Sequence, residues 1–216
     1  KKIYQKLFKF ATLLFITMLF VSCSSWSNFK LNQGKNPPIT PDTIAVICGS
    51  SSEYDIYFAE KLTEELEKTN FKVVKQDQIK KIIPQYPDQI LNFNISDDNF
   101  TKPYISEETK KMIDSIQLKL KTKYILLAWT EDVGTVTVKE GGSTLGKKVK
   151  ICFYTRLLQY PESNIIGYTF VCMSKGLGLF YFVDTGKKIA EALESLINDK
   201  AKEIVSEINK LTSFSN

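Results

Sequence analysis

The chain has no histidine among its 216 residues and only 4 cysteines. Without an imidazole side chain, a histidine general base, a histidine metal ligand and a histidine pH switch are all excluded. If the thiol of Cys23 is modified, as argued below, the three remaining cysteines are too few for a four-thiolate zinc site. We therefore predict no catalytic residue, no metal site and no cofactor.

The basic excess of the chain lies almost entirely at its N-terminus. The whole sequence carries a formal charge of +5, but four of its 29 basic residues are lysines within residues 1–22. Without them, 25 basic residues face 24 acidic ones, so the rest of the chain is nearly neutral. A nucleic-acid partner would require a marked basic patch, and none is predicted.

The first 23 residues have the order of a bacterial secretory leader. Lysines come first, an uncharged stretch follows at residues 10–21, and then come Ser22 and Cys23. A basic front, a short apolar run and a small residue at the cleavage point are typical of a signal peptide. The sequence Phe-Val-Ser-Cys at its end resembles the lipobox of bacterial lipoproteins, in which the cysteine thiol is lipidated and becomes the mature N-terminus.

Two other interpretations of this leader remain open. The uncharged stretch at residues 10–21 has 12 residues, whereas a membrane-spanning helix needs about 20. The other alternative is an ordinary secretory signal in which Cys23 has no role. We predict a lipoprotein signal peptide at residues 1–22, and a lipidated cysteine with a flexible tether at residues 23–41, which are rich in Ser, Asn, Lys and Pro. Each acyl methylene buried in a bilayer contributes about 0.8 kcal/mol to anchoring.

The remainder is long enough for a single domain, predicted at residues 42–213. Apolar or alternating patterns predict strands at residues 44–48, 71–74, 124–129, 133–139, 148–158 and 165–173. Apolar side chains at helical spacing predict helices at residues 52–68, 106–120 and 187–211. Residues 80–104 carry no regular pattern and are predicted to form a long loop. The order β-α-β-α-β-β-β-α predicts an α/β sandwich with a mixed sheet and a long C-terminal helix.

This layout resembles a family of envelope lipoproteins. The resemblance rests on the Phe-Val-Ser-Cys sequence, on the strand-helix-strand unit from residue 44 to residue 74, and on the segments at 123–133 and 149–158. It is similar to the domain shared by the curli-secretion channel lipoprotein, the penicillin-binding-protein activator lipoproteins and the N-terminal domain of the Tol translocation protein. The resemblance implies a lipid-anchored α/β domain that binds or assembles with other envelope proteins, and it carries no catalytic motif.

A serine-rich turn follows the first strand and offers a candidate ligand site. Its residues are Gly49, Ser50, Ser51 and Ser52. A strand that ends in such a turn at a helix N-terminus can bind an anion through free backbone N–H groups. The alternative is that the serines cap the helix, with Ser52 and Asp55 forming an approximate capping box.

Cys152 and Cys172 are a candidate disulfide. If the turn at residues 161–163 is symmetric about Glu162, the two cysteines face each other across neighbouring strands, and apolar residues match on the opposite face. Export would permit the bridge. The alternative is two small buried side chains, because a slip of one residue would separate the thiols. The aromatic residues near these hairpins, Tyr154 and Phe170 among them, belong either to the core or to a partner surface.

From these features we predict a non-enzymatic, lipid-anchored protein of the bacterial cell envelope, with the outer membrane as the expected membrane. Its predicted partners are the membrane, through the N-terminal lipid, and another envelope protein or a second copy of the chain. The long loop at 80–104 and the hairpin tip at 140–147 are the expected contact elements. The alternative function is binding or turnover of an anionic, phosphate-bearing ligand at the turn from Gly49 to Ser52.

Overall fold

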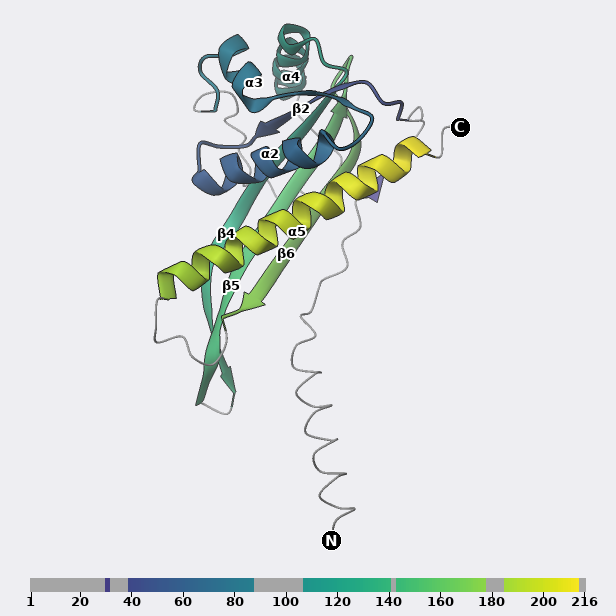
Figure 1. Cartoon of the computed structure of the whole chain (residues 1–216). Helices are drawn as coiled ribbons and strands as arrows, with labels where there is room; N and C mark the ends of the chain where they lie inside the picture. Colours follow the sequence, from purple (N-terminus) through teal and green to yellow (C-terminus); the bar gives the residue numbers. More distant parts are fainter. Residues whose placement is uncertain (1–29, 32–38, 88–106, 141–142, 178–184, 214–216) are drawn as a thin grey trace.

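A computed structural model describes residues 30–31, 39–87, 107–140, 143–177 and 185–213 (Figure 1). The predicted leader, Cys23, most of the tether and the larger part of the loop at 80–104 lie outside these residues, so they remain predictions. Within the described residues, no helix combines the length and the apolar character that crossing a membrane would require.

The core of the fold is a six-stranded mixed sheet with the order β1-β6-β5-β4-β2-β3. Its strands are β1 (Lys30–Leu31), β2 (Thr43–Cys48), β3 (Lys72–Val74), β4 (Tyr124–Glu140), β5 (Ser143–Gln159) and β6 (Asn164–Gly176). β2 is parallel to both of its neighbours, and the other pairs are antiparallel. The predicted fold class, an α/β fold with a mixed sheet and a long C-terminal helix, is confirmed.

Two helices lie across one face of the sheet (Figure 1). α2 (Glu53–Leu66) and α5 (Thr185–Ser213) pack against each other and against the strands beneath them. α2 buries Phe58, Leu62 and Leu66 at helical spacing, and the Phe58 ring lies 5.0 Å from the ring of Phe153 on β5. Because side chains alternate along a strand, Phe153 marks the helix-covered face and its neighbour Tyr154 points to the opposite face.

The connection from β3 to β4 holds a short helix that the sequence did not predict. α3 (Gln76–Ile82) occupies the start of the segment that had been assigned to an irregular loop, so that assignment is wrong for residues 80–82. The helix has seven residues and buries only Ile79, too little for a visible apolar period. α4 (Glu107–Leu120) follows, close to the prediction of 106–120.

The two long strands β4 and β5 form a ribbon that projects beyond the rest of the sheet (Figure 1). The predicted strands at 124–129 and 133–139 are one continuous strand, because a bulge between Glu131 and Gly134 absorbs one extra residue without breaking the pairing. Asp132, inside this bulge, has a positive φ of 51°. β6 ends opposite Lys148, so the remainder of the hairpin is two strands wide.

The register of β5 against β6 follows the prediction over most of its length. The pairs that match it are Ile151 with Met173, Cys152 with Cys172, Phe153 with Val171, Tyr154 with Phe170 and Arg156 with Tyr168. Near the turn the register shifts by one residue between Leu157 and Leu158, so the connection is not symmetric about Glu162. The turn is held against α4 by Asp114, which accepts hydrogen bonds from the Glu162 N–H and the Ser163 hydroxyl at 3.2 and 2.8 Å.

Candidate functional site

The turn from Gly49 to Ser52 lies where β2 ends and α2 begins. The Gly49 N–H donates to the Ala128 carbonyl at 2.8 Å and so extends the ladder between β2 and β4 by one bond. A Cβ at Gly49 would lie 2.6 Å from the Cβ of Trp129, so only glycine allows β4 to come this close. Ser52 is the N-cap of α2, and its hydroxyl accepts from the Asp55 N–H at 3.3 Å.

The buried carboxylate of Asp55 is the centre of this turn. Its Oδ1 accepts from both the N–H and the hydroxyl of Thr130, each at 2.7 Å, and its Oδ2 accepts from the Ser50 hydroxyl at 2.7 Å. The residue is only 2% exposed. Burial raises the pKa of Asp55, while the hydrogen bonds from Ser50 and Thr130 partly oppose that shift.

In these contacts the polar side chains of the turn bind one another and the neighbouring strand. The reciprocal half of the predicted capping box is not formed, because the Asp55 carboxylate binds Thr130 and Ser50, while the Ser52 N–H donates to the Ser50 hydroxyl at 3.1 Å. Two of the three serines therefore act within the turn, as the capping alternative expected. A carboxylate also stands at the helix end where an anion would be bound.

Two polar side chains that were not predicted from the sequence, Gln76 and Tyr86, complete the edge of β2 beyond the end of β3. β3 pairs with β2 only as far as Ala45, which leaves the carbonyl of Val46 and the N–H of Cys48 without a strand partner. The amide Nε2 of Gln76 donates to that carbonyl at 2.9 Å, and the Cys48 N–H donates to the Tyr86 hydroxyl at 3.1 Å. The Tyr86 hydroxyl in turn donates to Oε1 of Gln76 at 2.8 Å.

The same environment makes the thiol of Cys48 unreactive. The side chain is 2% exposed, and burial raises its pKa to about 11. Because the thiolate is the nucleophilic form, almost none of it is present near neutral pH. Cys48 is therefore a core residue.

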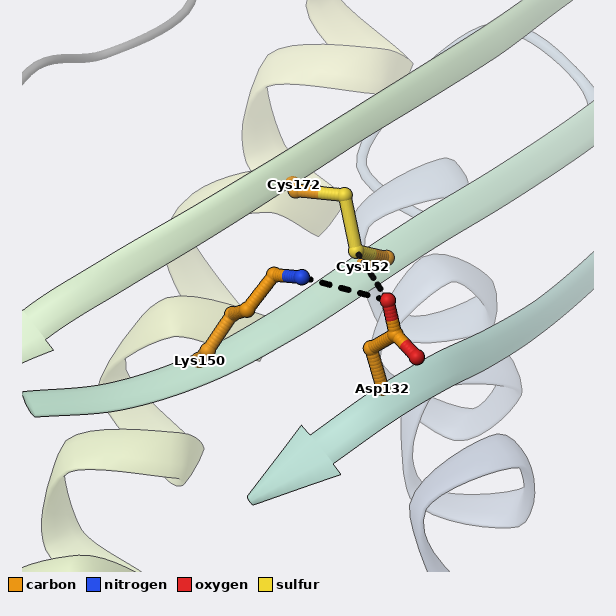
Figure 2. Close-up of a disulfide and its surroundings, with 4 residues drawn as sticks. All are labelled: Asp132, Lys150, Cys152 and Cys172. Atoms are coloured by element: carbon orange, nitrogen blue, oxygen red, sulfur yellow. Dashed lines mark hydrogen bonds and ion pairs between the residues drawn. A yellow bond between two sulfur atoms is a disulfide. The ribbon is translucent and has the colours of Figure 1, made fainter. Parts of the chain in front are cut away.

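The candidate disulfide is present in the structure. Cys152 and Cys172 are bridged across β5 and β6, on the face of the sheet opposite α2 and α5. Figure 2 shows the carboxylate of Asp132 beside the bridge, with Oδ2 3.7 Å from Sγ of Cys152 and 3.1 Å from Nζ of Lys150. The positive φ of Asp132 in the bulge of β4 gives the carboxylate this position.

An aromatic row crosses three strands on this same face. Trp129 stacks on Tyr154 with ring centroids 5.3 Å apart, and Tyr154 stacks on Phe170 at 4.6 Å. The exposed fraction rises along the row from 3% at Trp129 through 8% at Tyr154 to 39% at Phe170. Burial, and then Glu131 on the neighbouring strand, raise the pKa of Tyr154. Two of the three rings are therefore core, and Phe170 is partly open to a partner.

The outer part of the β4–β5 ribbon carries exposed side chains: β6 still reaches the pair of Val136 with Lys148, and Thr137 lies just beyond it. Thr135, Val136 and Thr137 are exposed, and Val136, at 49%, is among the most exposed large apolar residues described. β2 pairs with β4 only up to Ala128, so no strand in the described part of the chain lies beside the outer edge of β4 here. Residues 141–142, at the predicted tip, lie outside the described part of the chain. No cluster of potential metal ligands occurs in the described residues.

No known protein family matches this sequence, and no curated protein does. Solved structures do show a likeness. They include the PelC dodecamer from Paraburkholderia phytofirmans, at 8% identity and a TM-score of 0.43, with 85% of this chain and 98% of that chain covered. Lipoprotein GNA1162 from Neisseria meningitidis has 11% identity and a TM-score of 0.43, with 74% and 99% covered. Protein XCC0632 from Xanthomonas campestris, of family DUF330, has 9% identity and a TM-score of 0.39, with 87% and 95% covered.

A bacterial lipoprotein is thus among the proteins with a similar arrangement. These three do not include the curli-secretion, penicillin-binding-protein activator or Tol proteins, so the narrower resemblance stays a prediction. With identities of 8–11% and TM-scores below 0.5, these likenesses carry no argument about function. Function has to be inferred from the residues of this chain.

Proposed function

We propose that this protein is a non-enzymatic, lipid-anchored component of the bacterial cell envelope whose α/β domain binds another envelope protein or a second copy of itself. The anchor is the thiol of Cys23, and the contact element is the outer part of the β4–β5 ribbon, from Val136 on β4 to Lys148 on β5. The leader sequence supports the anchor, and the structure of the ribbon supports the contact.

The observation that carries the proposal is the projection of this ribbon. An isolated two-stranded hairpin is at best marginally stable in water, because it buries little apolar surface. Here Val136 is exposed at the last position that β6 reaches, and the ribbon continues beyond it as two strands. No strand among the described residues pairs with the other edge of β4 there. A partner that packs on the ribbon or pairs with its edge would supply the missing burial and hydrogen bonds.

The alternative, an anionic ligand at the turn after β2, gains no support from the geometry. The hydroxyls of Ser50 and Ser52 are engaged within the turn, and the Asp55 carboxylate would repel an anion there. A thermal-shift screen with phosphate, nucleotides and sugar phosphates should therefore leave Tm unchanged. A clear shift with one of these compounds would favour the ligand-binding function instead.

A photo-crosslinking amino acid placed at Val136 tests the proposed contact in intact membranes. Leu118 on α4, which is 60% exposed and also aliphatic, provides the matched control position. We expect a discrete adduct from Val136 and none from Leu118, and mass spectrometry of the adduct shows whether the partner is another protein or a second copy. Adducts from both positions, or from neither, would contradict the proposal.

A further inference from the structure

The short strand β1 ties the N-terminal segment to the outer edge of the sheet. Lys30 pairs with Tyr168 and Leu31 with Gly167, antiparallel to β6. β6 is the last long strand on this side, and β3 is the last strand on the other side. The chain therefore meets the folded domain at the β6 edge before it enters the core at β2.

This pairing shortens the tether that the sequence predicted. The sequence predicts residues 23–41 as one flexible segment between the lipid and the domain. Seven residues separate Cys23 from Lys30, which span at most about 25 Å when fully extended. A flexible chain of this length would have a root-mean-square reach of only about 15 Å. Without β1, the twenty residues from Cys23 to Thr43 would reach about 70 Å when extended, enough for the domain to turn in any direction.

Because the sheet is wider than the usual reach of the tether, one orientation of the domain on the membrane is favoured. β5, β4 and β2 lie between β6 and β3, so four strand spacings of about 4.8 Å separate the two edges by about 19 Å. If the β3 edge faced the bilayer, β6 would lie farther from it than the usual reach of the tether, and the tether would have to be stretched. Stretching costs conformational entropy, which the opposite orientation avoids.

We propose that β1 orients the domain on the membrane, with the outer edge of β6 toward the lipid surface and the β3 edge away from it. This inference rests on the proposed lipid anchor at Cys23. The occupant of the β6 side is the phospholipid surface itself. In the described part of the chain, β1 is the only strand on the outer edge of β6, so residues 169–176 of β6 carry a free backbone edge on that side.

Energy transfer to the membrane surface measures this orientation. The acylated protein is placed in phosphatidylcholine–phosphatidylglycerol vesicles that carry an acceptor on a lipid headgroup. A fluorescent amino acid is the donor, either at the exposed Asn164 on β6 or at the exposed Lys72 on β3, which lie within one residue of the same level across the sheet. With edges about 19 Å apart, we expect about twofold higher transfer efficiency from Asn164 than from Lys72. Equal transfer, or higher transfer from Lys72, would overturn the proposal.

Two variants test whether β1 causes the orientation. An insertion of about 20 Gly/Ser residues between Asn28 and Phe29 leaves β1 intact and lengthens the tether. The double substitution Lys30→Pro and Leu31→Pro keeps the length but removes the N–H donors of β1. Both should abolish the difference between the two donor positions while attachment persists. A difference that survives both variants would also overturn the proposal.

Failure of the anchor gives a different result from failure of the orientation. A protein without acyl groups would not float with vesicles at all. In that case the same measurement is made on chains coupled through the Cys23 thiol to a maleimide-bearing lipid. The bridged pair Cys152–Cys172 and the buried Cys48, with its pKa of about 11, would not compete for the maleimide. The comparison between Asn164 and Lys72 then decides the orientation by itself.

Discussion

Individual residues determine what the turn after β2 can do. Asp55 has its carboxylate buried between the first turn of α2 and the backbone of β4, and the three hydrogen bonds it accepts join segments that are far apart in the sequence. A buried carboxylate at a helix N-terminus is often taken as a sign of chemistry. Here its partners are a backbone amide and two hydroxyls of the fold, which indicates a structural role.

Asp55 predicts a pH dependence of stability with a defined sign. Because burial raises its pKa in the folded protein, the folded state binds the proton more tightly than the unfolded state does. Its contribution to stability is fully present below the unfolded pKa and is lost as the pH rises through the raised folded pKa. We therefore expect the free energy of unfolding of the parent, relative to Asp55→Asn, to increase as the pH falls from neutral to about 4.

Urea denaturation of both proteins across this pH range measures the effect. Asp77→Asn on α3, which changes an exposed carboxylate, is the control and should track the parent at each pH. A difference between the parent and Asp55→Asn that is constant, or that shrinks on acidification, would be inconsistent with a raised pKa at this site.

Gly49→Ala tests the close approach of β4 to the turn. The new methyl group would lie 2.6 Å from the Cβ of Trp129, and such overpacking typically costs about 1–3 kcal/mol. Gly134→Ala in the bulge of β4 is the control, because nothing lies within 4 Å of its added Cβ. The midpoint of chemical denaturation should fall clearly for the first variant only. Equal midpoints would mean that glycine is not required at position 49.

At the scale of elements, side chains extend the sheet where its strands end. Gln76 and Tyr86 replace the missing part of β3, and Asp55 binds the Thr130 N–H beyond the end of β2. Such contacts satisfy backbone groups that would otherwise be buried without partners, a cost of about 1–3 kcal/mol each.

Tyr86→Phe removes one of these edge contacts. The substitution leaves the Cys48 N–H and Oε1 of Gln76 without the hydroxyl that now serves both, so we expect a loss of about 1–3 kcal/mol in the free energy of unfolding. The Cys48 amide should also exchange its hydrogen faster, which NMR can detect. Tyr54→Phe on α2, where the ring is half-buried, is the control and should change little. Unchanged stability and exchange in Tyr86→Phe would refute the role of the hydroxyl.

Because of the disulfide, we expect the stability of the domain to depend on redox conditions. A bridge between residues 20 apart in sequence stabilises a fold by about 3 kcal/mol in the chain-entropy model. Reduction should lower the denaturation midpoint of the parent and leave that of the double variant Cys152→Ala, Cys172→Ala unchanged. Counting thiols on the unreduced, unfolded acylated protein should find Cys48 alone. Three free thiols would show that the bridge does not form.

The β5–β6 pairing was predictable because three local signals agree. The turn at residues 161–163 marked where the chain reverses, apolar residues matched on one face, and the two cysteines matched on the other, although the centre of the turn is not at Glu162. The shift between Leu157 and Leu158 was not predictable, since no composition rule marks this bulge. α3 was not predicted because its single buried residue, Ile79, cannot show the apolar spacing of a helix.

The site was less predictable than the fold. Ser52 as a helix cap follows from local sequence alone. The contact between Asp55 and Thr130 joins residues 75 apart, and that of Gln76 with Val46 spans 30, so neither has a local signature. The role of Tyr86 depends on where β3 ends, which only the folded sheet determines.

At the scale of the whole molecule, the features combine into a domain with two distinct ends. β1 pairs with the outer edge of β6, and the β4–β5 ribbon projects beyond the sheet (Figure 1). Buried polar groups described here serve the fold, while exposed apolar groups such as Val136 and Phe170 are available to partners. This division suits a protein that is fixed at a membrane and acts through contact.

The mass of the intact protein isolated from bacterial membranes tests the central claim most directly. We expect a species that begins at Cys23, lacks residues 1–22 and carries added acyl mass on that cysteine, and we expect Cys23→Ser to lose both the cleavage and the lipid. A protein found in the soluble fraction with residues 1–22 still attached and no acyl mass would contradict the account.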